Sequence, residues 1–175
     1  GIVQSVQQIT GMLSGTMNQD EAYQFIRMGR NLERADMTTR IIDVANTELG
    51  NPEDDTSPYQ NVMWVSVLQS LSAYQMYRRS VRNNVRPADV LEFLVRSKVF
   101  PRAVSHCLLE IEQSMRMLPR GGEALKVAQS VHRKVKRTKA GELKGDELVK
   151  YLDDIQLRLQ GIHEAIQQTW FTPEQ

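Results

Sequence analysis

The sequence predicts an all-α protein, an antiparallel helical bundle of five or six helices. No stretch of the chain has the alternating polarity typical of a β-strand. A long run, Gln19–Leu49, contains no proline and has helical spacing of its apolar residues. Near the C-terminus, apolar residues recur alternately four and three positions apart, the seam by which antiparallel helices pack: Leu148, Leu152, Ile155, Leu159, Ile162 and Ile166.

The segment Gln19–Leu49 predicts the central helix. Asn18 is a suitable N-cap residue, and Asp20 and Glu21 place negative charge at the positive end of the helix dipole. At about 100° per residue, one line along the helix collects Ala22, Ile26, Gly29, Glu33, Met37, Arg40 and Val44. A glycine inside a helix costs about 1 kcal/mol relative to alanine, so Gly29 indicates that another backbone approaches closely.

Glu33 interrupts this apolar line, so we expect its carboxylate to be at least partly buried. A buried carboxylate is costly unless it is paired. Arg40 is its first expected partner, with Arg30 or Arg34 next and Tyr74 as a third member. The candidate polar cluster is Glu33, Arg34, Arg30, Asp36, Arg40, Tyr74 and Arg78. Three interpretations remain open: a structural ion network, a cleft in which Glu33 acts as acid, base or ligand anchor, and an exposed groove that a partner fills.

The other elements follow from apolar spacing and from residues that start or end helices. Helices are expected at Ile2–Met12, Tyr59–Asn84, Ala88–Arg96, Arg102–Met117, Glu123–Thr138 and Asp146–Trp170. Gly11, Ser14 and Gly15 are expected to end the first of them. Pro87 and Pro101 each open the helix that follows, because proline fits a first helical turn.

The segment Asn51–Pro58 predicts an exposed connecting loop, since it combines two prolines with three acidic residues. The first helix carries Ile2, Val6 and Ile9 on one side. We expect these side chains to face solvent or a neighbouring copy of the chain, so a homo-oligomer is possible.

Composition limits the class of protein. The 175 residues, 41% hydrophobic and 25% charged, fit a single globular domain. A net charge of +1 argues against a dedicated polyanion binder. The single Cys107 excludes an internal disulfide and fits a cytoplasmic protein. No apolar stretch approaches the ~18 residues of a membrane span.

The sequence predicts no metal and no cofactor. His106 and Cys107 are neighbours on a helix and therefore point about 100° apart, so they do not converge on one ion. The sequence has no Cys-x-x-Cys and no His-x-x-x-His pattern. The turn Leu118–Gly122 lacks the Lys-Ser/Thr ending of a phosphate loop.

Basic residues gather towards two helix ends. The groups are Arg78, Arg79, Arg82 and Arg86, and Arg133, Lys134, Lys136, Arg137 and Lys139. Cations stabilise the negative end of a helix dipole, which favours solvated helix ends. Binding of RNA or another anionic ligand is the alternative interpretation.

Several segments together resemble a known family. They are Gly11–Val44 with Glu33-Arg34, Ser72-Ala73-Tyr74 with Tyr77-Arg78-Arg79, Phe100-Pro101-Arg102, and Ile162–Ile166. In combination they resemble the bacterial alpha-E family, an all-helical domain named for its Glu-Arg motif. Family members are usually longer and carry an earlier Glu-Arg motif. The chain is therefore expected to be a single helical domain, residues 1–175, from the C-terminal part of a longer alpha-E protein.

The resemblance implies a partnership with ATP-grasp amide-bond ligases or transglutaminase-like peptidases. The expected function is thus a non-catalytic helical accessory or interaction module in peptide or amide metabolism, because the sequence lacks a nucleotide loop and a nucleophile–base pair. An enzyme using Glu33 with arginine and tyrosine support is the alternative. RNA or anionic-ligand binding through the basic helix ends is a second one. Whether the chain is an enzyme remains open.

Overall fold

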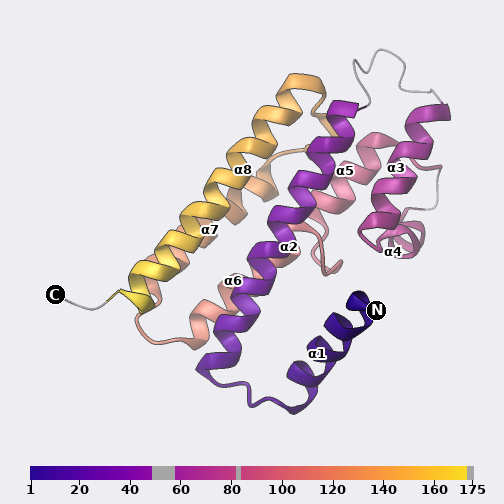
Figure 1. Cartoon of the computed structure of the whole chain (residues 1–175). Coiled ribbons are helices and arrows are strands. Elements are labelled where there is room, and N and C mark those ends of the chain that lie inside the picture. The colour runs from indigo at the N-terminus through magenta and orange to yellow at the C-terminus, as the bar shows by residue number, and fades with distance from the viewer. Residues whose placement is uncertain (49–57, 82–83, 173–175) are drawn as a thin grey trace.

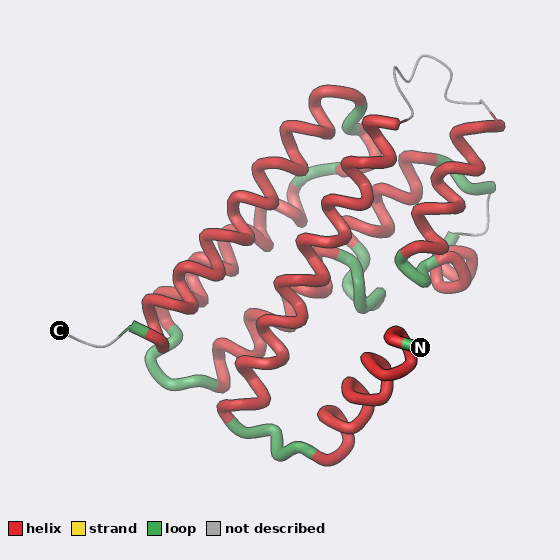
Figure 2. Tube along the Cα trace, in the orientation of Figure 1, coloured by secondary structure: helices red, strands yellow, loops and turns green. Residues whose placement is uncertain are grey.

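The computed structural model of the chain describes residues 1–48, 58–81 and 84–172, and these residues form helices and short connections without a strand (Figures 1 and 2). The α-helices are α1 (Ile2–Thr16), α2 (Glu21–Glu48), α3 (Pro58–Ser70), α4 (Tyr74–Ser80), α5 (Pro87–Arg96), α6 (Val104–Met117), α7 (Gly122–Arg137) and α8 (Gly145–Ile166). A 3₁₀ turn, η1 (Ala140–Glu142), precedes α8, and a π-helical turn, η2 (Gln167–Phe171), follows it. The predicted all-α class is confirmed.

Helices α2, α6, α7 and α8 form a closed four-helix bundle (Figure 1). In it, α2 and α7 each pack against both α6 and α8. The predicted seam of α8 is confirmed, since Leu148, Leu152, Ile155, Leu159, Ile162 and Ile166 are all buried. Ion pairs join neighbouring helices: Arg27 on α2 pairs with Glu110 on α6 at 2.5 Å, and Lys134 on α7 pairs with Asp154 on α8 at 2.8 Å.

A second group of helices covers one end of the bundle. Helix α5 packs against α6 and η1, and α3 packs against α2 and α5. Aromatic rings join this layer, with Tyr77 edge-on to Phe93 at 5.6 Å and Phe93 stacked on Phe100 at 5.0 Å. The η1 turn lies so close to α5 that a Cβ atom on Gly141 would stand 2.6 Å from the carbonyl oxygen of Ala88.

The expected single helix Tyr59–Asn84 is wrong, because the chain breaks it into α3 and α4. Ser72 adopts a left-handed conformation with φ of 53°. Its N–H donates to the Gln69 carbonyl at 2.9 Å, and the Ala73 N–H donates to the Leu68 carbonyl at 2.7 Å. These bonds satisfy the last carbonyls of α3 and end it. The described part of the chain has eight α-helices, more than the five or six expected.

The N-terminal boundaries also differ from expectation. Helix α1 continues through Gly11 to Thr16, because a glycine weakens a helix without forbidding it. The Ser14 hydroxyl donates to the carbonyl of Thr10, within the helix. At the start of α2, the Tyr23 N–H donates to the side chain of Asp20 at 3.2 Å, so Asp20 takes the capping role expected of Asn18.

The expected loop Asn51–Pro58 lies outside the described residues, except that Pro58 begins α3. The predicted start of α5 is confirmed, since Pro87 occupies its first turn. Helix α6 begins at Val104, after the turn that contains Pro101, so the prediction that Pro101 lies in its first turn is wrong. Across the described helices, none combines the length and the apolar character that crossing a membrane requires.

Candidate functional site

The apolar line on α2 faces solvent. Within it Glu33 and Arg40 are exposed, and Met37 and Val44 are 46% and 61% exposed. The buried side of α2 instead carries small, polar and a few apolar residues: Gln24, Met28, Asn31, Ala35, Thr38, Thr39, Ile42 and Ala45. The prediction that the line through Glu33 is buried is therefore wrong.

Polar side chains can occupy the buried side of α2 because backbone carbonyls accept their hydrogen bonds. The Asn31 amide donates to the Arg27 carbonyl at 2.8 Å. The Thr38 hydroxyl donates to the Arg102 carbonyl at 2.8 Å. Small side chains such as Ala35 leave room for α6 to pack closely, so α2 uses its more polar side as its packing surface.

The expected polar cluster does not assemble around Glu33. The Glu33 carboxylate is exposed and has no hydrogen bond or ion pair with any described residue. Arg40 pairs with Asp36 at 2.7 Å instead of with Glu33. Two grooves border Glu33, one between α1 and α2 and one between α2 and α8. Tyr74 and Arg78 lie on α4 and line neither of them.

Replacing Glu33 by glutamine is accordingly expected to leave the free energy of unfolding within about 0.5 kcal/mol of the wild type, as for most exposed sites without partners. Urea unfolding of both proteins measures this difference. A loss of several kcal/mol would mean that Glu33 has a buried partner, as the sequence led us to expect.

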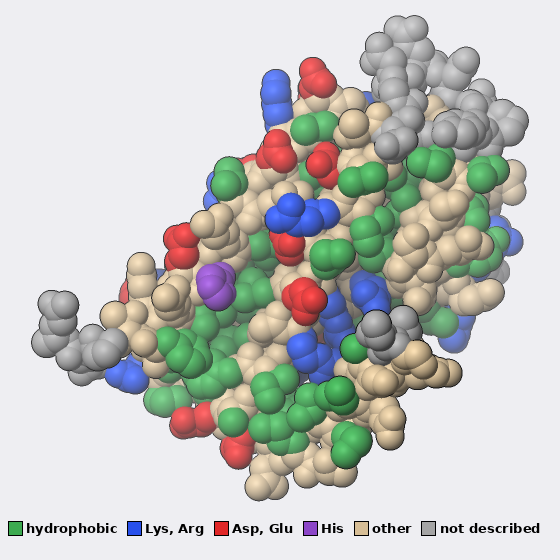
Figure 3. All heavy atoms as spheres, viewed as in Figure 1, with side chains coloured by type: hydrophobic (Ala, Val, Ile, Leu, Met, Phe, Trp, Pro, Cys, Tyr) green, Lys and Arg blue, Asp and Glu red, His purple; other side chains and the backbone are tan. Residues whose placement is uncertain are grey.

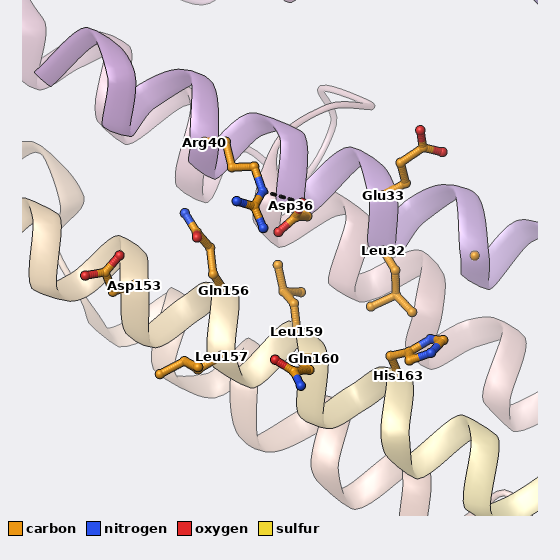
Figure 4. A pocket seen from close by; sticks show the side chains of 11 residues that line it. Leu32, Glu33, Asp36, Arg40, Asp153, Gln156, Leu157, Leu159, Gln160 and His163 are labelled. Atoms are coloured by element: carbon orange, nitrogen blue, oxygen red, sulfur yellow. Dashed lines mark hydrogen bonds and ion pairs between the residues drawn. The ribbon is translucent and has the colours of Figure 1, made fainter. Parts of the chain in front are cut away.

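The larger groove runs between α2 and α8 and has a volume of about 810 Å³ (Figure 4). Its lining residues are Gly29, Leu32, Glu33, Asp36, Arg40, Asp153, Gln156, Leu157, Leu159, Gln160 and His163. Figure 4 shows the Glu33 carboxylate pointing away from α8. No described atom beyond its own helix and chain neighbours lies within 4 Å of a Cβ placed on Gly29, so this glycine does not mark a close backbone contact here.

The second groove, called here the α1–α2 groove, has a volume of about 590 Å³. It is lined by Val6, Gln7, Ile9, Thr10, Leu13, Ile26, Arg30, Glu33, Arg34, Met37 and Arg102. Figure 3 shows blue side chains gathered beside α1 among green hydrophobic ones. Val6 and Ile9 are each 56% exposed, as expected, and the Ile2 side chain lies outside the described residues.

Three arginines line the α1–α2 groove, and no described acid pairs with any of them. Burial, and then the charge of Arg34, lowers the pKa of Arg30. Arg34 and Arg102 both lie close enough to Cys107 to lower the pKa of its thiol, although burial outweighs them and raises it to about 12. Positive charge is therefore concentrated in this groove.

Sequence reasoning missed a buried hydrogen-bonded chain between α6 and α7. Ser105 Oγ lies 3.1 Å from His132 Nε2, and His132 Nδ1 lies 2.5 Å from Glu112 Oε1. A neutral ring that donates from Nδ1 and accepts at Nε2 satisfies both bonds. Arg116 donates to the other Glu112 oxygen at 3.0 Å. Ser105 and Glu112, two turns apart on one helix face, were the available signal.

This order of groups matches a catalytic triad, but substrate cannot reach it in this structure. Ser105, His132 and Glu112 are 1%, 3% and 6% exposed, and none lines a described groove. Catalysis by such a triad requires an accessible serine oxygen next to oxyanion donors. The arrangement therefore ties α6 to α7.

The pKa of His132 is lowered from its ordinary value of 6.5, chiefly by burial, and the hydrogen bond to Glu112 opposes this effect without reversing it. Lys136 and Lys98 also lower it. Just below pH 6.5, His132 therefore binds a proton in the unfolded chain but not in the folded chain. The contribution of His132 to stability is complete above about pH 6.5 and is lost as the pH falls below that value.

Urea unfolding between pH 5 and pH 7.5 measures this dependence. The decline towards acid is expected to be weaker in His132→Gln, which does not titrate. It is expected to persist in His163→Gln, because His163 is exposed. Equal declines in both variants would contradict the assignment to His132.

His106 and Cys107, the neighbouring residues considered for metal binding, have different surroundings in the structure. The His106 ring lies 2.7 Å from the Lys98 carbonyl through Nδ1, and Cys107 is buried. Over the part of the chain that the structure describes, no group of three or more His, Cys, Asp or Glu side chains could hold a metal ion.

Comparison with known proteins identifies one family model, described as a predicted alpha-helical domain with a conserved ER motif, which matches residues 1–171. No curated protein and no solved structure matches the chain. Glu33-Arg34 is the only Glu-Arg pair in the sequence. The match extends over nearly the whole chain and not over a C-terminal part of it, while its membership of a longer protein stays a prediction. The chain belongs to the Alpha-E family.

Proposed function

We propose that this chain is a non-catalytic helical interaction module that binds a partner protein through the surface formed by α1, α2 and α8. The observation that carries the proposal is that α2 turns its apolar line outwards. Met37 and Val44 are exposed on it; Met37 lines the α1–α2 groove with Ile9, and Leu157, which is 69% exposed, lines the groove between α2 and α8. Grooves on a folded domain that are lined by exposed apolar side chains typically mark a binding surface.

The chemistry of the described residues supports a non-catalytic role. The nucleophilic side chains of Ser105 and Cys107 are buried, and the pKa of the Cys107 thiol is raised to about 12. The polar cluster that an enzyme would have used is divided between two grooves on either side of Glu33, with Tyr74 and Arg78 elsewhere.

The proposed partner is an ATP-grasp amide-bond ligase or a transglutaminase-like peptidase, as the resemblance to alpha-E proteins implies. The complex would form in the bacterial cytoplasm, where a free thiol such as Cys107 stays reduced. Charge favours a partner whose contacting surface is acidic, because Arg30, Arg34 and Arg102 lie beside the exposed apolar side chains.

Affinity capture of the tagged chain from its host, with identification of bound proteins by mass spectrometry, tests this proposal. The wild-type chain is expected to capture a ligase or peptidase of these classes. Ile9→Gln and Met37→Gln should reduce its recovery strongly, since each removes apolar contact from the surface. Met117→Gln is the matched control, because Met117 is 68% exposed and lines neither groove.

Equal recovery with all three variants would place the partner on another surface. Recovery of neither enzyme class would overturn the proposed partnership. Amide-bond formation or hydrolysis by the purified chain alone, abolished in Glu33→Gln, would favour the enzymatic alternative.

A further inference from the structure

We propose that the α1–α2 groove binds an acidic amphipathic helix, whose carboxylates pair with Arg30, Arg34 and Arg102 and whose apolar side chains pack against α1. The proposal deepens the proposed function by naming the part of the partner that the surface recognises, and it rests on that function only in assigning the helix to a partner protein.

The α1–α2 groove carries an excess of positive charge. Its charged lining residues are three arginines and one carboxylate, that of Glu33. The three arginines in the groove have no carboxylate partner among the described residues, whereas six described arginines elsewhere each have one: Arg27, Arg40, Arg86, Arg96, Arg116 and Arg158. The groove is therefore a place where guanidinium groups have gathered without their usual partners.

Two of the cations in the groove are partly buried. Arg30 and Arg34 are both only partly exposed, and they lie close enough to repel each other. Desolvated like charges are costly until an anion arrives. Guanidinium groups bind carboxylates in paired, directional hydrogen bonds, so carboxylates of a partner would relieve the repulsion and gain strong contacts.

Apolar side chains of both helices also line the groove. Val6, Ile9 and Leu13 face the groove from α1, and Ile26 and Met37 face it from α2. Helix α1 packs closely against none of the other described helices, and Figure 1 shows it set apart from the bundle. A third helix lying between α1 and α2 would cover both walls, as amphipathic helices do when they bind in grooves.

The composition of the groove favours an acidic helix over RNA. Single-stranded nucleic acid is held by stacking of its bases on aromatic side chains as well as by cations. None of the described residues that line the groove is aromatic, whereas five are aliphatic or methionine: Val6, Ile9, Leu13, Ile26 and Met37. A carboxylate-bearing apolar helix uses both kinds of lining residue.

The test is selection of binders from a displayed library of random peptides against the full chain. Recovered peptides are expected to combine Asp or Glu with Leu, Ile or Phe at helical spacing. One of them, labelled with a fluorophore, then reports binding by anisotropy. Its Kd should rise about tenfold or more in Arg34→Gln and in Arg102→Gln, because each loses a charge-assisted hydrogen bond. Added salt should also raise the Kd.

Two controls accompany these variants. Arg133→Gln removes an exposed arginine of α7 outside the groove and should leave the Kd unchanged. Arg34→Lys keeps the charge without the paired geometry and should give an intermediate Kd. Thermal unfolding of each variant shows whether the chain still folds. If Arg34→Gln does not fold, Arg102→Gln, at an exposed site, provides the test.

The proposal is overturned if no peptide is recovered, if recovered peptides are neutral or basic, or if the groove variants bind them as the wild type does. It is also overturned if an RNA oligonucleotide binds more tightly than any peptide and loses binding in the same variants. Capture of a ligase that is indifferent to Arg34→Gln would remove this inference and keep the proposed function. Acidic peptides that bind while no ligase or peptidase is captured would do the reverse.

Discussion

Replacing His132 by leucine is expected to lower the free energy of unfolding by about 3 kcal/mol, because it leaves the buried Glu112 carboxylate without its closest donor. The Ser105 hydroxyl loses its acceptor at the same time. Arg116, which is about half exposed, still binds Glu112 and keeps the loss near the lower end of the range for broken buried pairs. For a chain of this size the melting temperature should fall by about 2–4 °C per kcal/mol.

The double variant His132→Leu with Glu112→Met provides the control. It removes the buried charge together with its donor, so it should recover more than half of the lost stability. Denaturant unfolding of the wild type, the single variant and the double variant gives both values. If the single variant is as stable as the wild type, or the double variant is less stable than the single, the buried chain of hydrogen bonds does not stabilise the fold.

Gly141→Ala is expected to cost about 1–3 kcal/mol, the usual range for overfilling a packed site. The new Cβ would stand 2.6 Å from the backbone carbonyl oxygen of Ala88, and that backbone cannot rotate away as a flexible side chain could. The η1 turn must therefore move from α5. Thermal or urea unfolding measures the loss.

Gly29→Ala is the matched comparison, since no described atom outside its helix and chain neighbours lies within 4 Å of its added Cβ. This substitution should raise stability by up to about 1 kcal/mol, the difference in helix propensity. A destabilising Gly29→Ala would indicate a close neighbour on the exposed side of α2. A neutral Gly141→Ala would mean that η1 and α5 adjust easily.

The sequence predicts the bundle well where apolar residues mark packing. The seam from Leu148 to Ile166 is apolar at every position that α8 buries in it, so its period gives both the helix and its inward side. The long helix is predicted by its helical spacing and its lack of proline, although its apolar line faces solvent, and its limits differ from Gln19–Leu49 by one or two residues. The helix break at Ser72 could not be predicted, because the left-handed backbone of this serine depends on how the chain packs after α3.

The candidate site is harder to predict because α2 reverses the usual rule. Its packing side holds Asn31 and Thr38, whose hydrogen bonds are made to carbonyl groups, while Met37 and Val44 face outwards. The spacing of apolar residues shows which side of a helix they share, and it does not distinguish a core from a binding surface. Glu33 was therefore correctly placed on the apolar line, and the line was assigned to the wrong side.

Because Cys107 is buried, its reaction with a thiol reagent reports how often the helical bundle opens. Cys107 is the only cysteine of the chain, and with a pKa of about 12 its thiolate fraction near neutral pH is about a thousandfold below that of a thiol with the ordinary value of 9.0. An alkylating reagent therefore reacts mainly with molecules in which the packing around α6 has opened. The alkylation rate therefore measures the fraction of protein molecules that are open. A substitution that loosens the bundle should therefore speed the alkylation of the Cys107 sulfur atom. This rate can be measured without attaching a label to the protein.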